Sequence, residues 1–293
     1  MTRFHLFHRR PLIRFLFFAL LITFMQTGPV TATGHNPFGS LQDKLIADGF
    51  EATTIKRLYI DPDVTFETKG VSLFFVHSEA KLDYGQFTNN WSLKRARKYM
   101  QQHRDDLQRI ESEYGVDKEV IVAIILVETG LGQTLGTRSI LNTLSSLAAL
   151  EDTTLRNELW QSLSKSKDLT RKAFDRKASR KATWAYRELK AFLAYVLKED
   201  IDPTSVYGSY AGALGIPQFM PTNIVAYARD GDLDGHIDLF NHADAMASIA
   251  SYLKRYGWKP GLSKAKAKKI VHRYNHSDYY VNTILKISAR LKG

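Results

Sequence analysis

Apolar residues are most concentrated in residues 121–127, a run of seven uncharged and mostly β-branched side chains. A carboxylate, Glu128, follows directly, and Gly130 and Gly132 come just after it. The run predicts a buried helix that begins after Asp117 and ends at Glu128. Burial and the negative end of the helix dipole both disfavour an ionised carboxylate, so we expect a raised pKa for Glu128. A carboxyl group that stays protonated near neutral pH suits a general acid, although a solvated helix cap is the common alternative.

Helical spacing of leucine, isoleucine and alanine predicts further helices along most of the chain. We expect them at residues 41–48, 51–60, 93–114, 139–150, 154–163, 182–197, 223–229, 242–256, 265–274 and 277–291. Residues 64–77 are richer in β-formers and are expected to be extended or a strand. The predicted fold class is therefore mainly α, with a small extended or β portion.

Two stretches do not fit a simple helical pattern. Residues 207–222 read Y-G-S-Y-A-G-A-L-G-I-P-Q-F-M-P-T, with three glycines and two prolines among aromatic residues. This composition predicts a loop whose backbone closely approaches a ligand, with a packed structural turn as the alternative. Residues 164–190 hold ten Lys or Arg against three acids. They indicate a solvated helix face or, as the alternative, a patch that faces a substrate.

The N-terminus has the layout of a secretory signal. Residues 1–14 contain four arginines and no acid, residues 15–25 are almost wholly apolar, and residues 30–32 are Val-Thr-Ala. The apolar segment is shorter than the ~20 residues that span a bilayer. We therefore expect a signal peptide at 1–32, a linker at 33–40, one folded domain at 41–293, and export to the periplasm. An uncleaved N-terminal membrane anchor is the alternative.

Charge and cysteine content narrow the function classes. The formal net charge is +11, and it falls to +7 after cleavage at Ala32 because residues 1–32 hold four basic and no acidic residues. Such a surface suits an anionic polymer, and nucleic acid is not expected outside the cytoplasm. The absence of cysteine excludes disulfides, thiolate metal sites, a cysteine nucleophile and a lipid-modified N-terminal cysteine.

Residues 230–244, D-G-D-L-D-G-H-I-D-L-F-N-H-A-D, resemble an EF-hand loop. Acids stand at positions 1, 3, 5 and 9 and a glycine at position 6, which suits a hard cation and a sharp turn. Asn241 replaces the usual glutamate at position 12, and Asp244 at position 15 can replace it if the loop is longer. We expect a structural Ca²⁺ and no organic cofactor, with a solvated acidic turn as the alternative. The expected ligands are Asp230, Asp232, Asp234, the main-chain carbonyl of His236, and Asp244.

Four stretches together resemble the membrane-bound lytic murein transglycosylase B family, glycoside hydrolases with a lysozyme-like α+β core. They are V-E-T-G-L-G, Y-G-S-Y-A-G-A-L-G-I-P-Q-F-M-P, the D-G-D-L-D-G-H-I-D-L loop with its Asp244, and Y-N-H-S-D-Y-Y. The resemblance runs from about residue 84 to 285, and the four stretches follow the family's order.

The resemblance implies roles for individual residues. Glu128 matches the family's single catalytic acid and base, and the metal-loop residues named above match its calcium ligands. The residues that match the sugar-binding groups are Tyr84, Ser209, Gln218, Phe219, Tyr252, Tyr274, Asn275 and Tyr280. Phe219, Tyr252 and Tyr274 would offer ring faces to sugars, with core packing as the alternative for each. Residues 151–154 read Glu-Asp-Thr-Thr where the family often has Tyr-Pro-Arg-Arg, which leaves the stem-peptide preference open.

The activity implied by the resemblance is cleavage of the β-1,4 bond between N-acetylmuramic acid and N-acetylglucosamine, with formation of a 1,6-anhydromuramyl end. The expected partners are peptidoglycan glycan strands and proteins of cell-wall synthesis or remodelling, and the protein is expected to act as a monomer. A hydrolytic lysozyme using the same site is one alternative. A non-catalytic, calcium-stabilised peptidoglycan-binding protein is the other.

Overall fold

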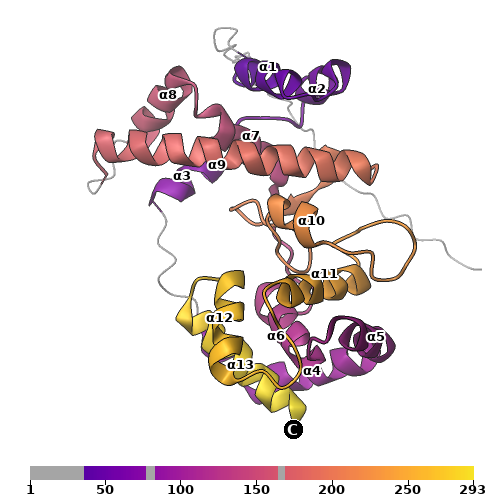
Figure 1. Cartoon of the computed structure of the whole chain (residues 1–293). Coiled ribbons are helices and arrows are strands. Elements are labelled where there is room, and N and C mark those ends of the chain that lie inside the picture. Colours follow the sequence, from indigo (N-terminus) through magenta and orange to yellow (C-terminus); the bar gives the residue numbers. More distant parts are fainter. Residues whose placement is uncertain (1–35, 77–82, 164–168) are drawn as a thin grey trace, which may run out of the picture. The chain divides into compact units, whose positions relative to one another are not determined.

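The computed structural model describes residues 36–76, 83–163 and 169–293, which are mostly helical (Figure 1). The predicted signal peptide and the first part of the predicted linker lie outside the described residues. The rest of that linker is not all linker, because Phe38 is buried in the core at 2% exposure and the first helix begins at Gly39. In the described ranges, no helix is both long and apolar enough to cross a membrane.

The described helices agree with the mainly α fold class predicted from the pattern. The α-helices are α1 (Gly39–Ala47), α2 (Ala52–Tyr59), α3 (Thr68–Val76), α4 (Asn90–Gln102), α5 (Arg104–Tyr114), α6 (Lys118–Thr129), α7 (Ile140–Ala149), α8 (Thr153–Leu163), α9 (Arg171–Lys198), α10 (Pro221–Tyr227), α11 (His242–Arg255), α12 (Lys264–Tyr274) and α13 (Asp278–Lys292). Short 3₁₀ turns are η1 (Tyr84–Phe87) and η2 (Pro203–Ser205).

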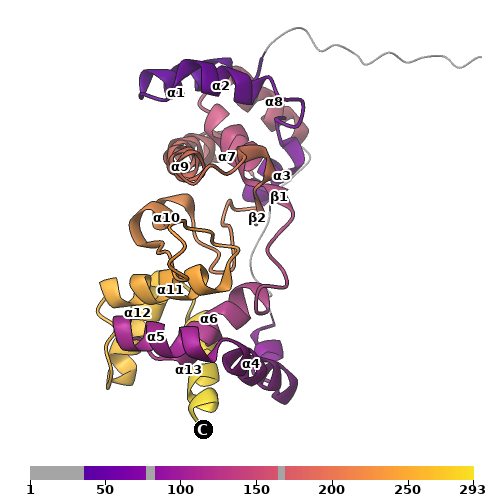
Figure 2. The same ribbon diagram turned by 90° about the vertical axis from the view of Figure 1, so that its right-hand side faces the viewer.

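Helix α6 is the buried helix that the apolar run predicts. Its residues 120–126 are at most 1% exposed, and α4, α5, α11 and α13 pack around it. The helix ends at Gly130, whose φ of +60° is the left-handed conformation that glycine adopts readily. Figure 2 shows α11 between α10 and α6, so that α6 is covered on several sides. Glu128 therefore lies at the end of one of the most buried elements of the protein.

Helix α9 organises a second group of helices. It is 28 residues long, and it packs against α7, α8 and α10 (Figure 1). The predicted helix at 182–197 is its C-terminal half. Most basic residues of 171–190 lie on the exposed side of α9, while Phe174, Ala178 and Ala182 are buried. This arrangement agrees with the interpretation of the charge run as a solvated helix face.

Two predicted elements differ in the structure. The expected extended segment at 64–77 contains helix α3, which places Val71 and Phe75 four residues apart on its buried side. That expectation is wrong because helical spacing prevails over β-forming composition where α3 packs on α7. The expected helix at 93–114 is broken at His103, which separates α4 from α5. The His103 ring lies against Tyr99 and His242, with centroids 4.4 and 4.8 Å away.

A small antiparallel pair, β1 (Arg138–Ser139) and β2 (Tyr207–Gly208), joins the segment after α6 to the glycine-rich loop. The register pairs Arg138 with Gly208 and Ser139 with Tyr207. A Cβ atom at Gly136 would lie 2.0 Å from the Gly208 carbonyl oxygen, so only glycine allows this approach. The pair fixes where residues 207–222 stand relative to the end of α6.

Candidate active site

Glu128 lies in the last turn of α6, and its side chain keeps partial exposure although the seven preceding residues are buried. Burial raises the pKa of Glu128 to about 7. The Tyr280 hydroxyl donates a 2.7 Å hydrogen bond to Glu128 Oε1, which lowers that pKa but by less than burial raises it. The predicted raised pKa is thus confirmed, and the carboxyl group can exchange a proton near neutral pH.

Tyr280 reaches Glu128 from the first turn of α13. The hydroxyl of Ser277 caps that helix and accepts the Tyr280 backbone N–H at 3.4 Å. Tyr280 is 1% exposed, and burial together with the nearby Glu128 charge raises the pKa of its hydroxyl well above the ordinary value. The hydroxyl therefore stays protonated and acts as a permanent donor to Glu128.

An aromatic cluster extends from Tyr280 under the glycine-rich loop. The rings of Tyr274 and Tyr280 are stacked, with centroids 6.4 Å apart, and the Tyr274 hydroxyl donates to the Pro217 carbonyl at 2.5 Å. Phe219 and Tyr252 lie 5.8 and 5.0 Å from the Tyr274 ring.

Burial separates the roles of these rings. Phe219 is 1% and Tyr252 is 4% exposed, so the expectation that they offer free faces to sugars is wrong and core packing holds for both. Tyr274 is only partly buried, as is the neighbouring Asn275, which caps the end of α12. Tyr274 and Asn275 are therefore accessible, and Phe219 and Tyr252 pack against the Tyr274 ring.

Thr129 links the end of α6 to the glycine-rich loop, a role that the sequence alone did not reveal. Its hydroxyl donates to the Ile216 carbonyl at 3.2 Å and accepts the Gly132 N–H at 3.0 Å, and the residue is 1% exposed. A buried hydroxyl needs such partners, since an unpaired one costs about 1–3 kcal/mol. The available signal was the position of Thr129, which directly follows Glu128 at the end of the apolar run of residues 120–127.

Gln218 has a left-handed backbone, with a φ of +50°. Its side-chain amide donates to the Gly215 carbonyl at 2.9 Å and to the Leu135 carbonyl at 3.4 Å. Sparsely populated backbone conformations of non-glycine residues cost on the order of 1–3 kcal/mol and concentrate at functional sites. The partly exposed Gln218 is thus held in a defined orientation beside Pro217 and Phe219.

Two further predicted sugar-binding residues, Ser209 and Tyr84, stand in the glycine-rich loop and in η1. The Ser209 Oγ accepts the backbone N–H groups of Ala213 and Ala211 at 3.1 and 3.3 Å, which closes the turn of the glycine-rich loop. Tyr84 stands in η1 and is close enough to Tyr280 to interact electrostatically with it. Neither side chain hydrogen-bonds directly to Glu128 within the described part of the chain.

Three carboxylates of the predicted metal loop converge. Oxygen atoms of Asp230, Asp232 and Asp244 lie within 4.8 Å of one another, and Gly235 makes the expected sharp turn with a φ of +94°. Asp244 is 1% exposed, and burial, with the Asp232 charge as a smaller cause, raises its pKa. A buried carboxylate that faces another carboxylate fits a hard cation.

The Asp234 carboxylate, the fourth predicted carboxylate ligand, is not part of this cluster. It is exposed and accepts the His236 backbone N–H at 2.8 Å. The main-chain carbonyl of His236 stays a predicted ligand, while the imidazole of the same residue lies 3.5 Å from Glu199. The arrangement thus brings three of the four predicted carboxylates together.

A curated relative matches part of the chain. Over 163 residues the chain is 35% identical to the membrane-bound lytic murein transglycosylase B of Escherichia coli (strain K12). The match covers 56% of this chain and 38% of that protein, so the chain spans about two fifths of the length of this relative.

Solved structures share the fold over nearly the whole chain. The lytic transglycosylase Slt35 of Escherichia coli in complex with calcium matches with a TM-score of 0.68 and 23% identity, over 92% of this chain and 96% of that one. SltB3 of Pseudomonas aeruginosa in complex with NAG-anhNAM-pentapeptide matches with a TM-score of 0.68 and 20% identity, over 87% of this chain and 80% of that one.

The family model described as "Transglycosylase SLT domain" matches residues 35–269, which is most of the chain and includes α6, the glycine-rich loop and the metal loop. Glu128 lies within the matched residues, and Tyr274 and Tyr280 lie beyond them. The chain belongs to the transglycosylase SLT domain family.

Proposed function

We propose that the protein is a lytic murein transglycosylase. It cleaves the β-1,4 bond between N-acetylmuramic acid and N-acetylglucosamine and leaves a 1,6-anhydromuramyl end. The observation that carries this proposal is the carboxyl group of Glu128, which is partly exposed, has a pKa of about 7 and is held by the Tyr280 hydroxyl. Membership of the transglycosylase SLT domain family supports the reaction class.

Glu128 acts first as an acid and then as a base. The protonated carboxyl donates its proton to the glycosidic oxygen, and the 2-acetamido group of muramic acid shares the positive charge that develops at C1. The resulting carboxylate then takes the proton of the C6 hydroxyl while O6 attacks C1. No water is consumed, and Glu128 ends protonated, as it began.

A single carboxylate is consistent with the surroundings of Glu128. Most glycosidases use two carboxylates. In the described ranges, the side chain that hydrogen-bonds to Glu128 is a tyrosine hydroxyl and not a second acid. A pKa of about 7 suits this double task because neither protonation state is strongly favoured at neutral pH.

Residues around Glu128 would orient the sugar. The Ser209 Oγ accepts two N–H groups, which leaves its own hydrogen to donate to the carbonyl of an acetamido group. The accessible Tyr274 offers a ring face, and Gln218 and Asn275 offer amide groups beside it. Phe219 and Tyr252 hold Tyr274 in place and contact no sugar.

The test compares the products of murein digestion by mass spectrometry for the wild type and Glu128→Gln. Glu119→Gln is the control, since Glu119 is a buried glutamate at the other end of the same helix. We expect anhydromuramyl products from the wild type and from Glu119→Gln, and a loss of more than about 1000-fold in Glu128→Gln, which still binds murein.

Other outcomes would contradict the proposal in different ways. Anhydro products from Glu128→Gln would show that this residue is not the acid. Wild-type products that are heavier by one water would identify a hydrolytic lysozyme. Murein binding without any cleavage would identify a non-catalytic binding protein.

We also propose that the loop of residues 230–244 holds a structural Ca²⁺. The carboxylates of Asp230, Asp232 and Asp244 would bind the ion. The Asp234 carboxylate and the main-chain carbonyl of His236 would complete the coordination. The converging carboxylates and the calcium complex of the structurally similar Slt35 support this proposal. No open coordination position is needed for the reaction, so the ion would stabilise the loop that leads into α11.

We propose that residues 1–32 direct export and that the protein acts on peptidoglycan glycan strands as a monomer in the periplasm. The arginine-rich and then apolar N-terminus supports export. The similar fold of SltB3, which was solved in complex with NAG-anhNAM-pentapeptide, supports a glycan strand as substrate.

A further inference from the structure

The positive charge of the protein is concentrated in its C-terminal helical hairpin. Residues 257–293 hold nine Lys or Arg and a single acid, Asp278. This excess of +8 is larger than the +7 net charge of residues 33–293, so the preceding part of the chain is nearly neutral. Helices α12 and α13 pack against each other and carry most of these cations.

A recess of about 450 Å³ lies where α12 ends and α13 begins. Its polar lining consists of Lys268, Lys269, His272, Arg273, His276 and Asp278. A cavity of this size can hold a small peptide or ligand.

Asp278 is the one carboxylate in the lining with which the cations of this recess could pair. Lys268, Lys269 and Arg273 take part in none of the ion pairs between described residues. The Arg273 guanidinium lies 5.1 Å from the ring centroid of Tyr256, which steadies it while its N–H edge can still donate. Three cations against one acid in a concave site favour an anionic ligand with more than one carboxylate.

The recess and the proposed reaction centre share the first turn of α13. Val281 lines it, and the preceding residue, Tyr280, donates its hydrogen bond to Glu128. The turn of α13 that contacts the catalytic carboxylate therefore also forms part of the recess wall. An extended pentapeptide spans about 17 Å, which is several times the length of one helix turn.

We propose that this recess binds the carboxylates of the stem peptide that the muramic acid residue carries at the reaction centre. Stem peptides are anionic because they contain an acidic residue and end on a free carboxylate. Lys268, Lys269 and Arg273 pair with these groups, and His272 and His276 add N–H donors. The proposal rests on the proposed function, since it places the muramic acid residue beside Glu128.

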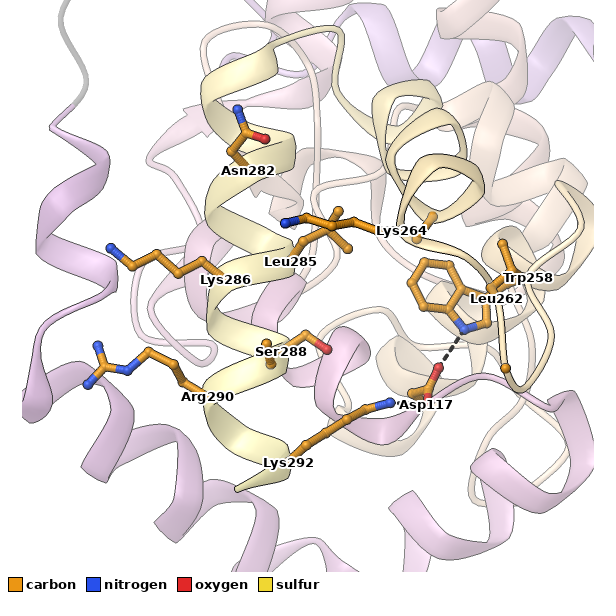
Figure 3. A pocket seen from close by; sticks show the side chains of 13 residues that line it. Asp117, Trp258, Leu262, Lys264, Asn282, Leu285, Lys286, Ser288, Arg290 and Lys292 are labelled. Carbon is orange, nitrogen blue, oxygen red and sulfur yellow. Dashed lines mark hydrogen bonds and ion pairs between the residues drawn. The ribbon is translucent and has the colours of Figure 1, made fainter.

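The same hairpin offers a matched control at its other end. A groove of about 750 Å³ there has an apolar lining that includes Leu262 and Leu285, and it also carries Lys264 and Lys286 (Figure 3). Its carboxylate, Asp117, accepts a 2.9 Å hydrogen bond from the Trp258 indole and pairs with Lys292. Removing Lys264 and Lys286 thus lowers the charge of the hairpin equally without touching the recess.

The experiment measures anhydromuramyl release from two substrates, glycan strands that carry pentapeptides and the same strands stripped of peptide by an amidase. Lys268→Ala/Lys269→Ala is compared with the control Lys264→Ala/Lys286→Ala and with the conservative Lys268→Arg/Lys269→Arg. We expect the recess variant to raise KM about fivefold to tenfold on peptide-bearing strands, with kcat and the stripped strands unaffected. The arginine variant should restore KM, and the control variant should stay near the wild type.

Binding separates the failure of this proposal from the failure of the proposed function. Calorimetry with GlcNAc-MurNAc-pentapeptide and with GlcNAc-MurNAc on Glu128→Gln, with and without the recess substitutions, needs no catalysis. Weaker binding of the peptide-bearing ligand alone supports the recess even if no anhydro product forms. Equal losses on both ligands and substrates, or no loss on either, would overturn the proposal.

Discussion

Glu128 combines a raised pKa with contact with solvent, two properties that rarely occur together in one carboxyl group. Helix α6 provides the first because the surrounding core removes water from one side of the carboxyl group. Its position in the last turn provides the second, since Gly130 ends the helix and turns the chain away. Tyr280 then limits the rise of the pKa by donating to the carboxylate. An acid that must also accept a proton needs both influences.

The raised pKa of Glu128 makes stability depend on pH. Its pKa rises from an ordinary 4.5 to about 7 in the folded protein, so ionisation costs more in the folded than in the unfolded state. The stabilising effect of the protonated form is complete below pH ~4.5 and is lost as the pH rises through ~7. Glu128→Gln cannot ionise and should therefore be more stable than the wild type at pH 8, by up to about 3 kcal/mol.

Urea unfolding at pH 4 and pH 8 tests this difference. At pH 4 the advantage of Glu128→Gln should disappear, because the wild-type carboxyl group is then protonated in the folded state. Glu119→Gln measures the general effect of replacing a glutamate on α6. An equal stability difference at both pH values would contradict the raised pKa.

Some residues of the site were visible in the sequence and others were not. Glu128 could be found because one carboxylate ends an uncharged run. The hydrogen bond from Tyr280 joins positions 152 residues apart, which no local pattern reports. The burial of Phe219 and Tyr252 was also hidden, since it depends on how α11 and α12 pack beneath the glycine-rich loop.

At the scale of elements, hydrophobic spacing predicted most helices because each helix buries one side. Helices α7, α11, α12 and α13 lie within a few residues of their expected bounds. Helix α3 was missed because Val71 and Phe75 lie among β-branched and aromatic residues that also suit a strand. The break at His103 follows from ring contacts with Tyr99 and His242, and His242 lies far along the chain.

A substitution in the metal loop should change the melting temperature differently with and without calcium. Asp232→Asn removes one negative charge from the carboxylate cluster with little change of shape. In excess Ca²⁺ the variant should melt at a lower temperature than the wild type, because bound ligand stabilises the folded state by about 2.7 kcal/mol at 100 times its Kd. In a chelator it should melt at the same or a higher temperature, because repulsion with the buried Asp244 is relieved.

Thermal unfolding followed by circular dichroism, in calcium and in chelator, checks this prediction. Asp238→Asn is the matched control, since Asp238 lies in the same loop but outside the cluster. A wild-type melting temperature that calcium does not change would argue against an ion in this loop.

At the scale of the whole molecule, the resemblance of four separate sequence stretches, in the same order along the chain, indicated the family. The excess of positive charge in residues 257–293 can be counted in the sequence, but the recess that part of it lines could not be predicted. The recess forms where α12 and α13 pack against each other.

The proposed export signal at the N-terminus predicts a cleavage that can be measured on the whole molecule. If residues 1–32 are a cleaved signal, protein recovered from the periplasm should begin at Thr33, and its intact mass should lack the four arginines of the leader. Ala32→Phe should block cleavage, because the peptidase site requires small residues. Recovery of the full-length chain from the membrane, with or without that substitution, would indicate an anchor instead.

The hydrogen bond between Tyr280 and Glu128 also determines when the site can form during synthesis of the chain. Ribosomes make Glu128 152 residues before Tyr280. A growing chain therefore carries its acid for most of its synthesis without the hydroxyl that holds it or the helix that covers α6. The arrangement of Glu128 and Tyr280 exists only once the last helix has been made and has docked, so an unfinished chain lacks the site to which we assign the proposed reaction.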